Sequence, residues 1–358
     1  MIPFRHQPVL LQETMQILDL KPGMKAVDCT VGGGGHGRPM LERVLPSGLL
    51  VAIDQDPQAL EAAEKNFREA VYGGSAGQTD PAPLHPSPQE PASRGPATQE
   101  PTPLHPSPQQ PTPPYVMVHS NFSRIKDILS ERQIGQLDAA LMDLGASSFQ
   151  FDEGARGFSY RHAGELDMRM DPLGGAPTAY DVVMSATAQD LAHILWRYGE
   201  ERWSKRIARA IVREREKAPI KTTDQLASVI RAAIPAAARA EGPHPAKRSF
   251  QALRIFVNRE LEILGEAIVD AAESLAPGGR LAVISYHSLE DRCVKEAFKT
   301  LAAGCICPKD FPICACGKAP QGRILTPKPI LPQPGEVEEN PRSRSAKLRA
   351  FEKGMPMK

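Results

Sequence analysis

The chain has 358 residues, of which 41% are hydrophobic, enough for a buried core in two domains or in one domain with large insertions. Its formal net charge of +1 does not by itself indicate a nucleic-acid binder, so local clusters of charge have to be considered. The N-terminus lacks the pattern of a signal peptide, and no apolar run approaches the roughly 20 residues of a membrane span, so we expect a cytoplasmic protein with no membrane partner.

Apolar runs and amphipathic segments alternate in the N-terminal part of the chain. This pattern predicts strands at residues 26–30, 49–53, 115–118 and 139–142, and helices at 38–45, 57–70 and 123–131. Strands that alternate with helices indicate a parallel α/β sheet. Residues 73–114 interrupt the pattern with Pro, Gly, Ser, Gln and Thr, and PAPLHPSPQEP recurs there as PTPLHPSPQQP. Because such a segment buries too little apolar surface to become ordered, we predict a disordered insertion.

The second half of the chain first turns helical and then returns to the α/β pattern. Helices are predicted at 188–197, 201–217 and 223–234, the last with Thr222 or Thr223 as its N-cap. A long amphipathic helix over 250–275 and a strand over 280–286 follow. We therefore predict an α/β domain formed by residues 1–150 and 249–358, with a helical insert at 151–248 that recognises the substrate.

A glycine-rich segment, DCTVGGGGHG at residues 28–37, follows the first predicted strand and opens a helix. Glycines allow the backbone to turn sharply and to approach a ligand closely. Asp54, at the end of the second strand, can accept hydrogen bonds from the ribose hydroxyls of an adenine nucleoside. This signal alone fits S-adenosylmethionine and a nicotinamide dinucleotide almost equally well. Asp28 favours the former, because a carboxylate suits the methionine ammonium and not a pyrophosphate.

Further motifs follow in order along the chain: HQPVLLQE at 6–13, DLGASSFQ at 143–150, RGFS at 156–159, LDMRMD at 166–171, YGEER at 198–202, FQALR at 250–254, NREL at 258–261, SYHSLEDR at 285–292 and NPRSRSAKLR at 340–349. In this order they resemble the bacterial RsmH (MraW) family of small-subunit ribosomal RNA cytosine-N4 methyltransferases. The resemblance covers nearly the whole chain except residues 73–114. One mild departure is Tyr286, where the family more often has Phe.

The resemblance implies a class I (Rossmann-like) S-adenosylmethionine-dependent methyltransferase fold with a helical insert. It implies methylation of a cytidine in 16S ribosomal RNA near the decoding centre, with the small ribosomal subunit as partner. The cofactor contacts that it implies are Gly34, Gly35, His36, Asp54, Phe122, Asp143 and Gln150. His36 has a purely structural alternative as the first residue of a helix. The oligomeric state is left open, a homodimer being one option.

The cytosine amino group is a weak nucleophile, so its methylation needs an in-line approach and an acceptor for its N–H groups. Asp143 is the main catalytic candidate, with a role in positioning the cofactor as the alternative. Asp167, Asp171, His287, Glu290 and Asp291 are secondary candidates. For His287 the alternative is a packed histidine that bonds to the backbone.

Phosphate contacts are predicted from clusters of basic residues, since Lys and Arg neutralise the RNA backbone. The basic residues of the helix at 201–217 are partly cancelled by glutamates and predict only a solvated helix face. The predicted RNA contacts are Lys247, Arg248, Arg254, Arg342, Arg344, Lys347 and Arg349.

Two C-x-C pairs contain four of the six cysteines, Cys305 with Cys307 and Cys314 with Cys316. Four thiolates can hold a structural zinc ion, and free thiols on a loop are the alternative. Two alternative functions are an NAD-dependent oxidoreductase, and a ribosome assembly factor that binds RNA without catalysis.

Overall fold

The computed structural model describes residues 8–73, 113–147, 150–151, 153–161, 163–239, 244–305, 307, 311, 313 and 316–355. The predicted insertion at 73–114 lies almost entirely outside these residues. Within them, no helix is both long enough and apolar enough to cross a membrane.

A seven-stranded sheet of order β3-β2-β1-β4-β5-β7-β6 forms the centre of the α/β part. Its strands are β1 (Lys25–Asp28), β2 (Leu49–Asp54), β3 (Tyr115–His119), β4 (Leu137–Asp143), β5 (Leu275–Ser285), β6 (Gly322–Ile324) and β7 (Lys347–Lys353). The first five in chain order are parallel, while β7 runs antiparallel to both β5 and β6. This is the class I methyltransferase order of strands, and it confirms the predicted fold class. The strand order reverses between β1 and β4, which in open α/β sheets is where ligands bind.

Helices cover both faces of the sheet. One face is packed by α1 (Leu11–Leu18), α2 (Gly37–Val44) and α3 (Pro57–Tyr72), and the other by α4 (Ile125–Glu131), α12 (Glu260–Glu273) and α13 (Ser288–Ala302). Local signals explain several starts: Asp56 accepts the backbone N–H of Gln58 and precedes Pro57 at the first position of α3. The predicted N-terminal helices and strands are confirmed to within a few residues.

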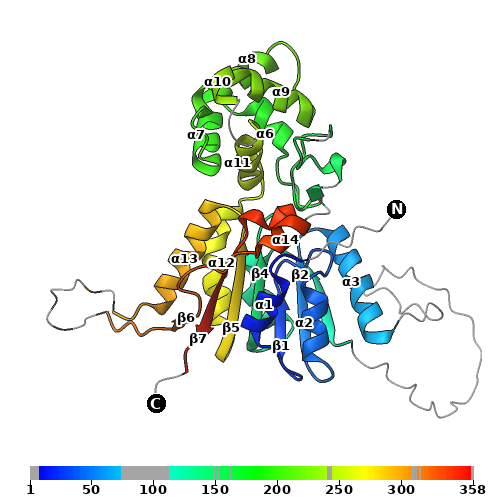
Figure 1. Ribbon diagram of the computed structural model, residues 1–358, viewed down its shortest axis with the longest axis vertical. Coiled ribbons are helices and arrows are strands. Elements are labelled where there is room, and N and C mark those ends of the chain that lie inside the picture. Colours follow the sequence, from blue (N-terminus) through cyan, green and yellow to red (C-terminus); the bar gives the residue numbers. More distant parts are fainter. Residues whose placement is uncertain are drawn as a thin grey trace, which may run out of the picture.

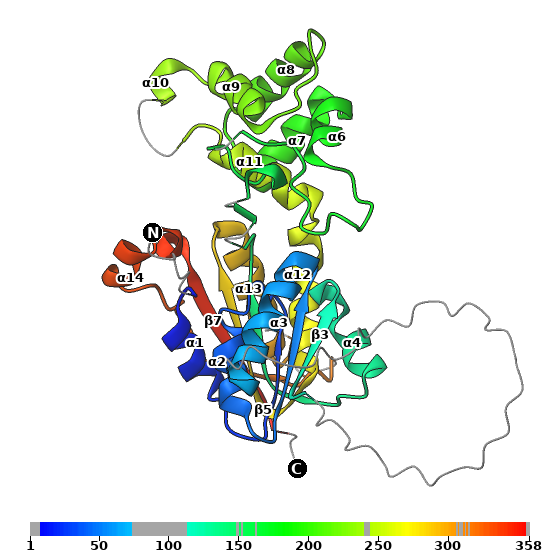
Figure 2. The same ribbon diagram turned by 90° about the vertical axis from the view of Figure 1, so that its right-hand side faces the viewer.

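A separate helical group stands at the carboxyl end of the strands (Figure 1). It comprises α6 (Ala179–Ser185), α7 (Ala188–Gly199), α8 (Ser204–Arg215), α9 (Thr223–Ala233), α10 (Ala236–Arg239) and α11 (Lys247–Val257), around a core of its own. Thr222 caps α9 through a capping box with Gln225, as predicted. Figure 2 shows the same two-part arrangement from the side.

The long helix predicted over 250–275 is wrong, because the chain breaks between α11 and α12. Arg259 adopts a left-handed conformation with φ of 53°. The side chain of Asn258 is drawn into tertiary bonds, accepting the N–H of Met170 at 2.7 Å and donating to the carbonyl of Met168 at 2.8 Å. The break therefore joins the helical group to the LDMRMD segment.

Candidate active site

Three carboxylates lie at the carboxyl ends of neighbouring strands: Asp28 on β1, Asp54 on β2 and Asp143 on β4. Burial raises the pKa of Asp28 to about 8, with Asp143 and Asp54 adding to the rise and a hydrogen bond from the Thr30 N–H opposing it. Burial also raises the pKa of Asp54 to about 6, against backbone hydrogen bonds that lower it. The site thus brings together carboxyl groups whose ionised forms are disfavoured by burial, and a ligand that carries positive charge would favour those ionised forms.

Gly32 and Gly34 give the glycine loop its shape, because both have positive φ values, 52° and 84°. The N–H of Gly32 donates to Oδ2 of Asp54 at 2.8 Å, so the loop and the end of β2 are fixed to each other. A side chain at Gly34 would meet Phe67 and Ala63, and one at Gly35 would meet Pro8. The loop is therefore packed on the protein side and presents its backbone on the other side.

Asp143 is held from three sides. Its N–H donates to Oγ1 of Thr30 at 2.7 Å, and the Tyr286 hydroxyl donates to Oδ1 at 2.7 Å. Nδ1 of His36 lies 3.5 Å from Oδ2. Burial, together with Asp143 itself, raises the pKa of Tyr286 well above its usual value of 10, so the phenol remains a donor. Asp143 is a fixed acceptor at the point where the strand order reverses.

The other predicted cofactor residues surround this point. His36 is buried, and its Nε2 lies 3.0 Å from the carbonyl oxygen of Val9, so its ring links the N-terminal segment to Asp143. Phe122 opens the short helix η1 (Phe122–Arg124) after β3 and packs against the core. Gln150 is buried, and its amide donates to Asp56 at 2.9 Å. Their direct contact with a cofactor remains a prediction.

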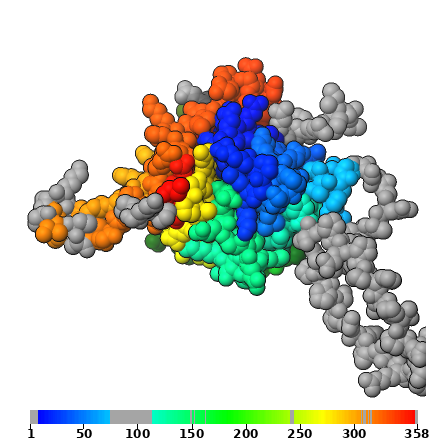
Figure 3. Space-filling model, turned by 90° about the horizontal axis from the view of Figure 1, so that it is seen from below, coloured from blue at the N-terminus to red at the C-terminus, as the bar shows by residue number. Residues whose placement is uncertain are grey.

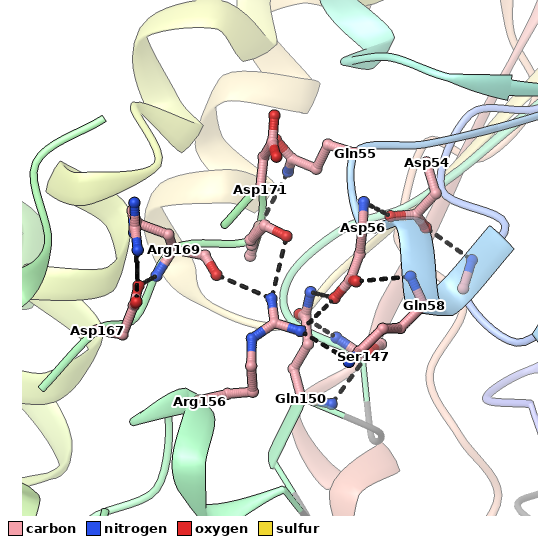
Figure 4. Close-up of polar contacts among 12 residues, drawn as sticks. Asp54, Gln55, Asp56, Gln58, Ser147, Gln150, Arg156, Asp167, Arg169 and Asp171 are labelled. Carbon is pink, nitrogen blue, oxygen red and sulfur yellow. Dashed lines mark hydrogen bonds and ion pairs between the residues drawn. The ribbon is translucent and has the colours of Figure 1, made fainter. Parts of the chain in front are cut away.

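Sequence reasoning missed Asp56 and the role of Arg156, which together join the site to the helical group. Asp56 is fully buried and accepts from Arg156 Nη1 at 2.8 Å. Nη2 of Arg156 donates to the carbonyls of Arg169 and Met170 at 3.0 and 3.2 Å. Figure 4 shows this network, with Arg156 between the end of β2 and the LDMRMD segment. The only local signal was the Asp-Pro start of α3.

Three of the secondary catalytic candidates, Asp167, His287 and Asp291, bond to residues other than Asp143. Partial burial acts to raise the pKa of Asp167, but hydrogen bonds from Arg169 at 2.7 and 2.8 Å hold it below its usual value. Nδ1 of His287 accepts the N–H of Glu290 and caps α13, which is the structural alternative for this residue. Asp291 binds Lys347 and Arg349. Asp167 and His287 thus have structural partners, and a catalytic role for either residue remains a prediction.

Two of the predicted RNA contacts are also corrected. Arg254 forms a bidentate ion pair with Glu260, with two N–O distances of 2.9 Å, and lies 3.8 Å from Glu290. Arg349 is buried and donates to Asp291 at 2.6 Å. Lys347 is partly buried and binds the same aspartate. Lys247, Arg248, Arg342 and Arg344 are exposed. The exposed set remains the prediction for phosphate contacts.

A groove of about 590 Å³ lies between α7 and the first turns of α12 and α13. Trp196 lines it and is 64% exposed, and three arginines, Arg197, Arg202 and Arg292, line it as well. Part of the helical surface predicted to be merely solvated therefore borders a cavity. The start of α13 contributes to both places, because Leu289 lines the groove while Tyr286, three residues earlier, bonds to Asp143.

Comparison with known proteins places the chain in a family. A family model described as the MraW methylase family matches residues 3–73 and 106–354. Proteins named ribosomal RNA small subunit methyltransferase H from Symbiobacterium thermophilum and Heliobacterium modesticaldum are each 46% identical, over 98% of this chain and 97% and 99% of theirs. The one from Brevibacillus brevis is 45% identical over 98% of this chain and 99% of its own. With its methyltransferase fold and fixed carboxylate at the end of β4, the chain belongs to the MraW methylase family.

Proposed function

We propose that this protein transfers a methyl group from S-adenosylmethionine to N4 of a cytidine in small-subunit ribosomal RNA. The main support for this proposal is the position of Asp143, whose carboxylate is bonded by Tyr286 and whose backbone N–H is bonded to Thr30, beside the glycine loop. Family membership supports methyl transfer and weighs against the NAD-dependent alternative. The relatives' names support the RNA substrate, which implies a cytoplasmic location.

The residues present fit the cofactor. Burial is the main reason that the pKa of Asp28 and the pKa of Asp54 are raised, and a ligand with a sulfonium and an ammonium would favour their ionised forms. Each oxygen of Asp54 accepts one backbone N–H, from Gly32 and Asp56, and each retains acceptor capacity for ribose hydroxyls. When bound, S-adenosylmethionine supplies an electrophilic methyl group.

Asp143 would act on the cytosine amino group. A carboxylate oxygen can accept a hydrogen bond from the amino N–H, which directs the nitrogen lone pair away from the ring as the new bond forms. The Tyr286 hydroxyl donates to Oδ1 of Asp143, so Oδ2, which lies 3.5 Å from His36, is the oxygen that would accept the hydrogen bond from the cytosine amino group. The Tyr286 hydroxyl holds the carboxylate in one orientation, which is how a fixed group accelerates a reaction.

The helical group would recognise the RNA. A cytosine reaches an active site only when it is unstacked, so the flanking nucleotides need a surface of their own. The groove beside α7 offers an exposed indole for stacking and three guanidinium groups for phosphates. Arg248 lies at the same edge, since Nη1 donates to the carbonyl of Glu200, another lining residue. We place the target near the decoding centre on the resemblance alone.

The test is methyl transfer from labelled S-adenosylmethionine to small subunits that lack the modification, followed by nucleoside mass spectrometry. We expect N4-methylcytidine from the wild type and from Asp127→Asn, whose carboxylate is exposed on α4. Asp143→Asn is expected to lose most of the rate but to retain cofactor binding by calorimetry. Unlabelled subunits, with cofactor binding intact in the wild type, would contradict the proposed substrate and favour an assembly factor. Mapping the labelled nucleotide tests its position.

A further inference from the structure

The loop between α13 and β6 contains a cluster of thiols that methyl transfer does not use. The Sγ atoms of Cys305, Cys307 and Cys316 all lie within 4.8 Å of one another. Cys314, the remaining predicted ligand, lies outside the described residues. From this cluster we propose that Cys305, Cys307 and Cys316 bind a structural Zn²⁺ ion that fixes the loop.

The sulfur–sulfur distances match a mononuclear site. Zn–S bonds of about 2.3 Å in a tetrahedron put neighbouring sulfurs about 3.8 Å apart. Sγ of Cys316 lies 3.7 Å from Sγ of Cys305, close to this separation and far longer than a disulfide bond. Three cysteines at the two ends of a twelve-residue stretch therefore already bring their sulfur atoms within 4.8 Å of one another, near the spacing that zinc requires.

A backbone group also supports the cluster. The N–H of Cys307 points at Sγ of Cys305, with a distance of 3.4 Å. N–H groups directed at a ligating sulfur stabilise its negative charge, and they are a regular part of the surroundings of a metal site. The short Cys-x-Cys spacing places this donor next to the sulfur that it supports.

The described apolar residues of the loop between the cysteines are not buried. Between the cysteines, Phe311 and Ile313 are 56% and 79% exposed, so these apolar side chains form no core there. Its base is closed, because the N–H of Gln321 donates to the carbonyl of Leu301 at 2.9 Å. Figure 3 shows the described residues of the loop, in orange, projecting from the body of the molecule. A segment without a core gains most from a metal ion, because metal binding then supplies its folding energy.

The ligand chemistry favours zinc. Thiolates select Zn²⁺, copper(I) and iron–sulfur clusters over the oxygen-binding cations, and zinc is the member whose structural sites are tetrahedral, so the three thiolates would supply three of its four ligands. The cluster follows the C-terminal end of α13, whereas Tyr286, which bonds to Asp143, precedes the N-terminal end of this helix. The metal would therefore act on the loop and take no part in methyl transfer.

The experiment measures metal in the full-length protein purified with a phosphine reductant and loaded with Zn²⁺. Elemental analysis after gel filtration should find about one zinc per chain. Cys305→Ser and Cys316→Ser should each lose it, whereas Cys293→Ser, a half-buried thiol of α13, should retain it. Wild type that carries no metal, that carries iron, or whose zinc survives both loop substitutions would overturn the proposal.

A second measurement uses only the wild type, so its result does not depend on whether the cysteine variants fold correctly. Reaction with a thiol-specific disulfide reagent should be slow at the loop cysteines, and a chelator should make them fast, with zinc released in step. Loading with Co²⁺ should give the visible absorption of a tetrahedral thiolate complex. Loop thiols that react at the same rate with and without chelator would show that they are free.

Discussion

The ion pair between Arg156 and Asp56 offers the sharpest test of how the helical group is joined to the cofactor site. Arg156→Met keeps much of the aliphatic length but removes the guanidinium. Asp56, which is 0% exposed, then loses its only cationic partner within 4.0 Å among the described residues. The carbonyls of Arg169 and Met170 lose their donor at the same time.

The cost follows from the burial of the carboxylate that is left behind. Breaking a buried pair by removing one partner destabilises a protein by about 3–5 kcal/mol, because an uncompensated charge stays in the interior. Arg156 is itself 11% exposed, so water can enter the space it leaves and reduce the loss. We therefore expect the lower end, about 3 kcal/mol, or on the order of a hundredfold in the folding equilibrium.

Urea titration followed by far-ultraviolet circular dichroism measures this loss. Tryptophan fluorescence adds a local probe, because Trp196 and Trp203 both belong to the helical group. Arg124→Met is the matched control: Arg124 is 54% exposed and pairs with Asp127 and Glu131, so we expect less than about 1 kcal/mol. Adding Asp56→Asn to Arg156→Met should recover part of the loss. A loss in Arg156→Met no larger than in the control would refute the reasoning.

Three further predictions concern the glycine loop and the groove. The pKa of Asp28 rises from 3.8 to about 8 on folding, so the folded chain holds a proton that the unfolded chain releases, and stability of the ligand-free protein falls as pH rises between these values. Asp28→Asn should remove this slope, by up to about 1.4 kcal/mol per pH unit in denaturation titrations. Gly37→Ala places a methyl group 2.7 Å from Phe67 and should cost about 1–3 kcal/mol in thermal unfolding, whereas Gly33→Ala, with open space around it, should cost little. Trp196→Ala should weaken binding to small-subunit RNA by about 1–3 kcal/mol in filter binding, without lowering stability.

Each of these has an outcome that contradicts it. A pH slope that persists in Asp28→Asn would show that another group holds the proton. Equal melting temperatures for the two glycine variants would show that the loop yields to the added methyl. Unchanged RNA affinity of Trp196→Ala would remove the groove from the substrate path.

The strands and the glycine loop could be predicted because their signals are local. Residues 49–53 form an unbroken apolar run, of which 50–53 are buried, and the loop can be identified from its glycine content. The break between α11 and α12 could not be predicted. The amphipathic pattern of the sequence continues through Asn258. The residues that bond to Asn258 at the break, Met168 and Met170, are about ninety residues away in sequence.

The C-terminal strand β7 was missed for a related reason. KLRAFEK contains two lysines, an arginine and a glutamate, so it suggests a basic tail and not an inner strand. Arg349 is tolerated there because Asp291, 58 residues earlier, meets it at 2.6 Å. Sequence alone cannot distinguish an arginine with a buried partner from one that faces solvent, and the same ambiguity misled the prediction for Arg254.

The N-terminus of α13 connects the Asp143 site to the groove of the helical group. Tyr286 fixes Asp143, Glu290 accepts the N–H of Tyr286 at 2.7 Å, and Ser288 donates to Glu200 at the groove. Arg254 contributes charge to the same Glu290 from α11, in the helical group. One short segment therefore sets the orientation of the candidate acceptor and the wall of the candidate RNA surface. We therefore interpret the motifs SYHSLEDR and FQALR as the joint that aligns the two sites, which explains why Glu290 is buried and why Arg254 pairs with Glu260 beside it.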